Sequence, residues 1–191
     1  MADTSQPTVN DYATGTQWRL AFNRLPKTTW FCTAANIPGI TLGEAMYPTP
    51  MADIPLTGDK LTFETLNITF IVDEELQNYR ELWDWMVGIG APVSHDQWAT
   101  VLTKGDGAIR QFGTDDADPR TKSTYEESNL YSDATLIVYS SKNQPKVNVQ
   151  FKNMFPTSLS GLDYSQELTD VEYFHAAATF RFLYYEFETA T

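Results

Sequence analysis

The sequence has little of the chemistry on which metal and covalent sites depend. Its 191 residues include one cysteine, Cys32, and two histidines, His95 and His175, which stand 80 positions apart. A single cysteine excludes an intrachain disulfide and a cysteine-rich zinc site. Neither a phosphate-binding glycine motif nor an HExxH motif is present. We therefore expect no cofactor, no bound metal and no enzymatic activity.

Positive charge is also scarce. Lysine and arginine together number 13 against 25 acidic residues, which gives a formal net charge of -12. Such a chain repels a phosphate backbone and an anionic membrane surface, so specific nucleic-acid binding and membrane association are not expected. No apolar run approaches the length of a membrane span, and the first residues lack the pattern of a signal peptide. We expect synthesis in, and retention by, a reducing cytoplasm.

Three weaker chemical interpretations compete with ordinary structural roles. Cys32 could be a nucleophile with His175 as its base, but its apolar neighbours favour a small buried side chain. Asp115, Asp116 and Asp118 resemble part of a calcium-binding loop. This segment lacks the glycine and the final glutamate that such loops need, so a solvated acidic loop is favoured. The aromatic helix face described below could hold a carbohydrate, although core packing is the better interpretation.

Apolar content is sufficient for a core. Hydrophobic residues make up 42% of the chain, and alternating apolar and polar positions predict several half-buried strands. The final segment has the longest alternation, and the parity change near Glu64 predicts a β-bulge. A corner is expected at 153–156. The predicted strands are Gln17 to Asn23, Thr29 to Ala35, Leu61 to Val72, Asp133 to Ser140, Lys146 to Phe151, Ser158 to Ser165 and Phe174 to Tyr185.

One amphipathic helix is predicted between these strands. Asp73 is a suitable N-cap, two glutamates follow in the first turn, and Gly88 and Gly90 are expected to end the helix. Its apolar stripe at helical spacing should face the core, and Trp85, which falls off it, is a candidate for an interface. The stripe consists of Leu76, Tyr79, Trp83 and Met86.

Two segments show no sustained period. Residues 36–59 contain four prolines and three glycines, which forbids a helix or a central strand and predicts a long extended loop. Residues 90–130 are polar and predict an irregular insertion. We expect one domain over 1–191 and a mainly β fold, with an antiparallel β-sandwich or barrel-forming sheets and one packed α-helix.

The order of these elements, together with short motifs, resembles the tail tube proteins of contractile-tailed, T4-like bacteriophages. The motifs are Phe31-Cys32-Thr33-Ala34, Ile37-Pro38-Gly39, Ile54-Pro55-Leu56-Thr57-Gly58-Asp59, Leu66-Asn67-Ile68-Thr69-Phe70, Asp73-Glu74-Glu75 and Lys152-Asn153-Met154-Phe155-Pro156-Thr157. They fall within 17–88 and 133–188. The insertion at 90–130 departs from the compactness of that family.

The resemblance implies a structural virion protein whose hexameric rings stack into the inner tube of the tail, through which DNA passes without specific binding. The implied partners are other copies of the chain, the sheath, the baseplate and the tail terminator. The alternatives are a tube-like baseplate protein that initiates the tube and, in a different class, a β-sandwich module that binds a glycan or a protein. Assembly distinguishes them, because a binding module should remain monomeric.

Two sets of residues follow as candidates for sites. Acidic side chains are expected to line the lumen or its rim, where like charge keeps DNA from adhering; they are Asp53, Asp59, Glu64, Glu172 and Glu186. The proline-rich loop has too few core residues to pack on its own chain, so we expect it to contact the next ring. The contact residues are Ile37, Met46, Tyr47 and Met51.

Overall fold

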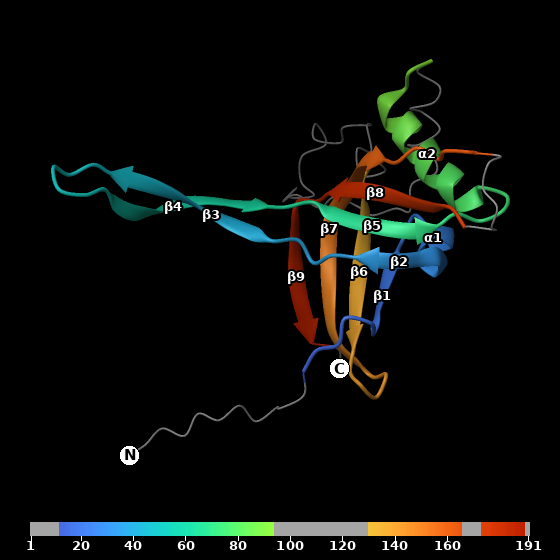
Figure 1. Ribbon diagram of the computed structural model, residues 1–191, viewed down its shortest axis with the longest axis horizontal. Helices are drawn as coiled ribbons and strands as arrows, with labels where there is room; N and C mark the ends of the chain where they lie inside the picture. The colour runs from blue at the N-terminus through green and yellow to red at the C-terminus, as the bar shows by residue number, and fades with distance from the viewer. Residues whose placement is uncertain (1–11, 94–129, 166–172, 190–191) are drawn as a thin grey trace, which may run out of the picture.

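The computed structural model describes residues 12–93, 130–165 and 173–189. These segments form two antiparallel sheets with a shared core, an α-helix packed on one of them, and a two-stranded hairpin that projects far from this body (Figure 1). The predicted mainly β, antiparallel fold is therefore confirmed. Insertion residues 94–129 and Glu172 lie outside the described residues.

The first sheet holds four strands in the order β1-β6-β7-β9. Its members are β1 (Trp18–Phe22), β6 (Ser132–Tyr139), the first part of β7 (Pro145–Leu159) and β9 (Tyr184–Thr189). The strand predicted at Gln17 to Asn23 pairs with β6, with Leu20 opposite Leu136. The strands predicted at Asp133 to Ser140 and Lys146 to Phe151 are confirmed.

The second sheet holds β7, β8, β5 and β2 in that order. Its further members are β8 (His175–Arg181), β5 (Leu66–Ile71) and β2 (Cys32–Ala35). Strand β7 belongs to both sheets, because it turns at Asn153, where φ is 53°, and changes partners from β6 and β9 to β8. The corner predicted at 153–156 thus marks where the two sheets meet.

Four predicted strands differ from the structure; one of them, Leu61 to Val72, is divided at Glu64 and Thr65. The first half of Thr29 to Ala35 is a short helix, α1 (Pro26–Phe31), because Pro26 suits a first helical turn and Thr29 bonds back to the Leu25 carbonyl. Residues 158–165 add no separate strand, since β7 itself runs to Leu159. The long final strand is divided into β8 and β9 at Phe182 and Leu183, because each part pairs with a different half of β7.

Near Glu64, where a β-bulge was predicted, the chain instead passes from one sheet to another. The hairpin strands β3 (Ile40–Tyr47) and β4 (Ile54–Phe63) form their own two-stranded sheet, and β5 begins at Leu66. The change of parity at Glu64 and Thr65 was the correct signal, but it marks the point where the chain returns from the hairpin to the body (Figure 1).

The helix α2 (Gln77–Gly90) begins three residues later than predicted, with Leu76 in place of Asp73 as its N-cap residue, and turns a different face inward. Trp85 is 2% exposed and packs on Phe180 of β8, whereas Trp83 is 50% exposed, so both tryptophan assignments were wrong. The buried face is Asn78, Leu82, Trp85 and Gly88. Because Asn78 is polar, the hydrophobic pattern alone favoured the neighbouring stripe.

Asn78 can be buried in this face because its side-chain amide is hydrogen-bonded to backbone groups. Its side-chain NH₂ donates to the Ile71 carbonyl at 2.8 Å, and its Oδ1 accepts the backbone N–H of Asp73 and of Tyr79. The amide therefore fixes the loop between β5 and α2. Asp73 lies in that loop, where its Oδ1 accepts the N–H of Gln77 at 2.8 Å.

Candidate assembly surface

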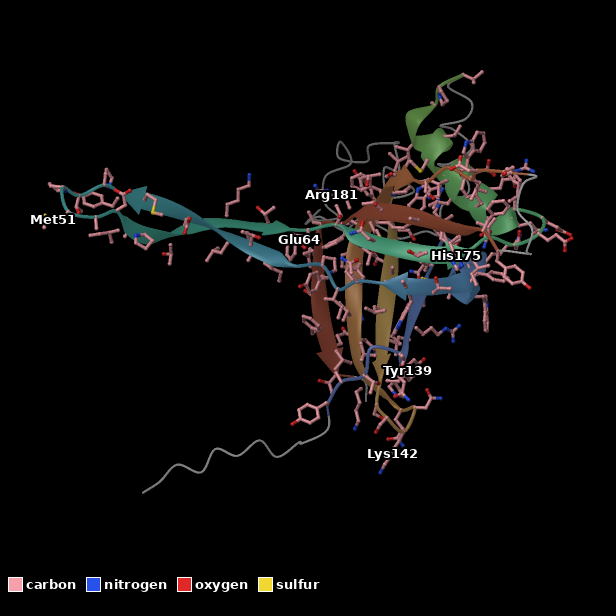
Figure 2. All side chains as sticks on the ribbon, in the orientation of Figure 1. Met51, Glu64, Tyr139, Lys142, His175 and Arg181 are labelled. Atoms are coloured by element: carbon pink, nitrogen blue, oxygen red, sulfur yellow. The ribbon has the colours of Figure 1, made fainter. Side chains whose placement is uncertain are left out.

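The hairpin formed by β3 and β4 is the most exposed part of the described chain. Every residue of β3 is exposed, and only two residues of β4 are partly covered. Figure 2 shows Met51 at the far end of this hairpin, well away from the body. The proline-rich loop predicted at 36–59 is therefore an extended projection, built as a paired ribbon. Its exposed large apolar side chains are Ile40, Leu42, Met46, Tyr47, Met51, Ile54, Leu56 and Leu61.

The apolar side chains of the hairpin are distributed differently in its two halves. Near the body, Ile40 pairs with Phe63 and Leu42 with Leu61, so the apolar pairs are at even positions of β3. Towards the end, three successive pairs are apolar: Ala45 with Leu56, Met46 with Pro55 and Tyr47 with Ile54. Strand alternation therefore puts apolar side chains on both faces of the outer half of the ribbon.

A close contact of two glycines lies at the middle of the hairpin. The register shifts between Leu42 and Glu44, so that Gly43 faces the stretch from Gly58 to Lys60. A Cβ added to Gly58 would stand 2.5 Å from the carbonyl oxygen of Gly43, which only glycine permits. The strands cross in Figure 1. Strong twist is typical of two-stranded ribbons with a bulge.

The base of the hairpin is fixed to the body by polar contacts. The Glu64 N–H donates to the Gly39 carbonyl at 3.0 Å, and the Glu64 Oε2 accepts the Gly39 N–H at 3.3 Å. The Tyr185 hydroxyl of β9 donates to the Pro38 carbonyl at 3.1 Å. These bonds join the first and last residues of the hairpin to each other and to β9, and so define the direction in which it leaves the body.

Aromatic packing strengthens this base. The Phe63 ring lies 5.7 Å from Phe182 and 5.5 Å from Tyr185, centroid to centroid. Phe151 of β7 packs on the same two rings at 5.2 Å and 5.7 Å. Because Phe151 is fully buried, the aromatic cluster connects the hairpin directly to the core.

The predicted lumen acids are not gathered at one place. Asp53 lies at the far end of the hairpin, Asp59 in its central bulge and Glu64 at its base, while Glu186 is exposed on β9. Glu64 also has a structural role through Gly39. Their orientation towards a lumen stays a prediction.

The β9 edge presents a second apolar feature. Strand β9 pairs with β7 on one side, and the part of the chain that the structure describes supplies no strand on its other side. The cross-strand row of Leu20, Leu136 and Val149 is buried, but its continuation on β9, Phe187, is 61% exposed. An unpaired edge that ends an apolar row is suited to receive another chain.

The alternative chemical sites gain no support from the described residues. Cys32 on β2 and His175 on β8 flank β5 on opposite sides, about 10 Å apart by strand spacing. Burial raises the pKa of the Cys32 thiol to about 11, which keeps it protonated at neutral pH.

No cluster of potential metal ligands occurs within 12–93, 130–165 and 173–189. His95, Asp115, Asp116 and Asp118 lie outside these ranges. Nor does any helix in them have the length and apolarity to cross a membrane.

Comparison with known proteins places this fold among components of contractile machines. No protein-family model and no curated protein matches the sequence. A chain from the sheath/tube terminator of an extracellular contractile injection system is similar over 94% of this chain and 99% of its own, with a TM-score of 0.57 and 11% identity. A chain from the anti-feeding prophage tube-terminating cap matches over 100% of both chains, with a TM-score of 0.52 and 15% identity.

A third structure extends this group. A chain from the sheath-tube complex of an extracellular contractile injection system matches over 100% of both chains, with a TM-score of 0.50 and 12% identity. At these identities the likeness concerns the fold. The mainly β fold predicted from the sequence is thus one that also occurs in a sheath-tube complex and in tube terminators of such systems.

Sequence reasoning missed several residues of this surface. Of the four expected contact residues, Ile37 precedes the hairpin, Met46 and Tyr47 lie on β3, and Met51 lies at its far end; all four are exposed. The apolar positions Leu42, Leu56 and Leu61 were not selected. Their alternation on either side of Gly43 and Gly58 was the available signal.

Proposed function

We propose that this chain is a structural, non-enzymatic subunit that forms rings of a contractile tail or injection machine, and that these rings build the inner tube. The projecting hairpin carries this proposal, because its exposed apolar residues have no core of their own. The likeness to tube and terminator folds supports it. The partners are further copies of the chain, the sheath, the baseplate and the terminator, and the rings are six-fold.

Within this function, the tube acts as a conduit for DNA in a virion tail. The formal charge of -12 supports a conduit role, since a strongly acidic subunit does not hold a polyanion that must slide past it. Asp53, Asp59, Glu64, Glu172 and Glu186 are the acids proposed for the lumen and its rim. A tube with a basic lumen would contradict this part.

A terminating ring is the second candidate. Its support is that chains from a sheath/tube terminator and from a tube-terminating cap have this fold. A tube subunit should polymerise without limit, whereas a terminator or a baseplate initiator should stop at one ring.

The test is assembly of the intact chain and of a chain with a shortened hairpin. Removal of residues 44–57 joins Gly43 to Gly58 and leaves a four-residue turn between the paired Leu42 and Leu61. We expect the intact chain to form rings or tubes by negative-stain electron microscopy, and the shortened chain to stay monomeric with an unchanged unfolding midpoint. A monomeric intact chain over a wide concentration range would refute the proposal and favour a binding module.

A further inference from the structure

The tip of the hairpin is acidic, apolar and preorganised. The tip is defined as residues 48–53. The Thr49 hydroxyl bonds both to the Ala52 carbonyl and, at 3.2 Å, to its N–H, which closes the turn. Met51 is 95% exposed, and Asp53 lies two residues after it. Between Ile40 and Asp53 the chain has two carboxylates and neither lysine nor arginine.

The body carries a hollow with the complementary character. It has a volume of about 380 Å³ and lies between β1, α1 and the end of β6. Two tryptophans, Trp18 and Trp30, and the ring of Tyr139 supply apolar wall, and Arg19 supplies positive charge. The lining includes no aspartate or glutamate, although acids outnumber bases by about two to one in the whole chain.

Arg19 is held in place without a carboxylate. Its guanidinium carbon lies 4.9 Å from the centre of the Trp30 ring, a cation–π arrangement that orients the charge at the mouth of the hollow. The ion pairs within the described ranges involve Lys27, Arg80 and Lys152, and none includes Arg19. Trp30 itself is 77% exposed, so this wall is open to a partner.

The tip of a chain and its own hollow lie in different regions. In Figure 2, Met51 lies at the end of the hairpin, whereas Tyr139 lies on the body near the turn that contains Lys142. Strand β3 alone extends about 27 Å at 3.4 Å per residue. The fixed base directs the tip outward, so the hollow can receive only the tip of another chain.

We propose that the hairpin tip of one copy of this chain docks in the Trp18–Trp30 hollow of a second copy, with Met51 against the tryptophans and Asp53 paired with Arg19. This inference rests on the proposed function and names its contact. Such an interface joins two different surfaces, so it is head-to-tail, and head-to-tail contacts produce rings or filaments. The paired charges fix the orientation, because like charges elsewhere on these acidic chains repel.

Charge exchange in the full-length chain tests this contact. Arg19→Glu and Asp53→Arg are each expected to raise the concentration needed for half-maximal assembly at least tenfold, as measured by sedimentation velocity and negative-stain microscopy. The double variant restores the pair and the wild-type net charge, and should assemble within about threefold of wild type. Unfolding curves of each variant confirm that the body is folded.

A matched control separates the local pair from net charge. Asp53→Arg with Arg80→Glu has the same net charge, but Arg80 lies on α2, away from the hollow lining; it should assemble as poorly as Asp53→Arg alone. Trp30→Ala, at an exposed position, should weaken assembly with little effect on the unfolding midpoint.

The outcomes distinguish the two proposals. A wild-type chain that forms no rings refutes the proposed function and this contact with it. A wild-type chain that assembles, with single variants that also assemble or with equal rescue by the control pair, refutes the tip-to-hollow contact alone.

Discussion

The body and the hairpin are stabilised in different ways. In the body, side chains from both sheets and α2 are buried completely, among them Phe70, Phe151 and Phe180. In the hairpin, the apolar side chains are about half exposed, and the strands are held by each other and by the contacts at the base. Packing within the chain thus stabilises mainly the body, whereas the hairpin leaves apolar surface exposed to other molecules.

The largest effect is expected where the body is most densely packed. Trp85→Ala removes a buried ring against Phe180 and a hydrogen bond from the indole N–H to the Leu130 carbonyl at 3.0 Å. We expect a loss of about 3–5 kcal/mol in the free energy of unfolding, measured by urea denaturation. Trp83→Ala, on the exposed side of the same helix, is the matched control and should cost less than about 1 kcal/mol. Equal losses would show that the face of α2 is misassigned.

An intermediate effect, confined to the hairpin, is expected at the glycine crossing. In Gly58→Val the new side chain meets the Gly43 backbone, so the ribbon must open there. We expect faster amide exchange in β3 and β4, by about 10- to 100-fold for about 1–3 kcal/mol of local strain, with unchanged exchange in β5 and β8. Gly15→Val, with open space around its Cβ, is the control. Faster exchange throughout the body would contradict the independence of the two regions.

The smallest effect on stability near neutral pH is expected at a residue at the junction between the regions, where the change is in thiol reactivity. Cys32 lies on β2, the last body strand before the hairpin, and its raised pKa of about 11 makes the thiolate rare at pH 8. Alkylation by iodoacetamide at pH 8 should be about 100-fold slower in the folded chain than in urea. The rate should rise as pH approaches 11. Because the folded thiol holds its proton longer than the unfolded one, stability relative to Cys32→Ala should fall from about pH 9 upward. Equal rates in both states would show that Cys32 is accessible.

The sequence predicted local conformation better than contacts between distant segments. Clean alternation located β1, β6 and the first part of β7, and the residues after Lys152 located the corner. Pairing of β1 with β6 was not predictable, because the partners are more than 100 residues apart and many alternating strands could pair. The prolines correctly identified the projecting segment, but they led to the prediction of a loop where the structure has the paired strands β3 and β4. A two-stranded ribbon has only edge strands, so Pro55 can occupy one without losing a ladder bond.

The candidate assembly surface was predicted only where it depends on local sequence, and not where it depends on contacts between distant segments. The exposure of Ile37, Met46, Tyr47 and Met51 followed from the lack of a local core, whereas the hollow is built from β1, α1 and the end of β6, which meet only in the folded chain. The helix face was misassigned because a buried amide, Asn78, serves backbone groups of a loop that the sequence does not display.

The bond from Tyr185 to Pro38 also sets an order of events during synthesis. The two residues are 147 positions apart, so the base of the hairpin cannot be completed until almost the whole described chain has been translated. At 5–20 residues per second this interval is roughly 7–30 s. A nascent chain therefore lacks, during this interval, the bond that joins the base of its hairpin to β9.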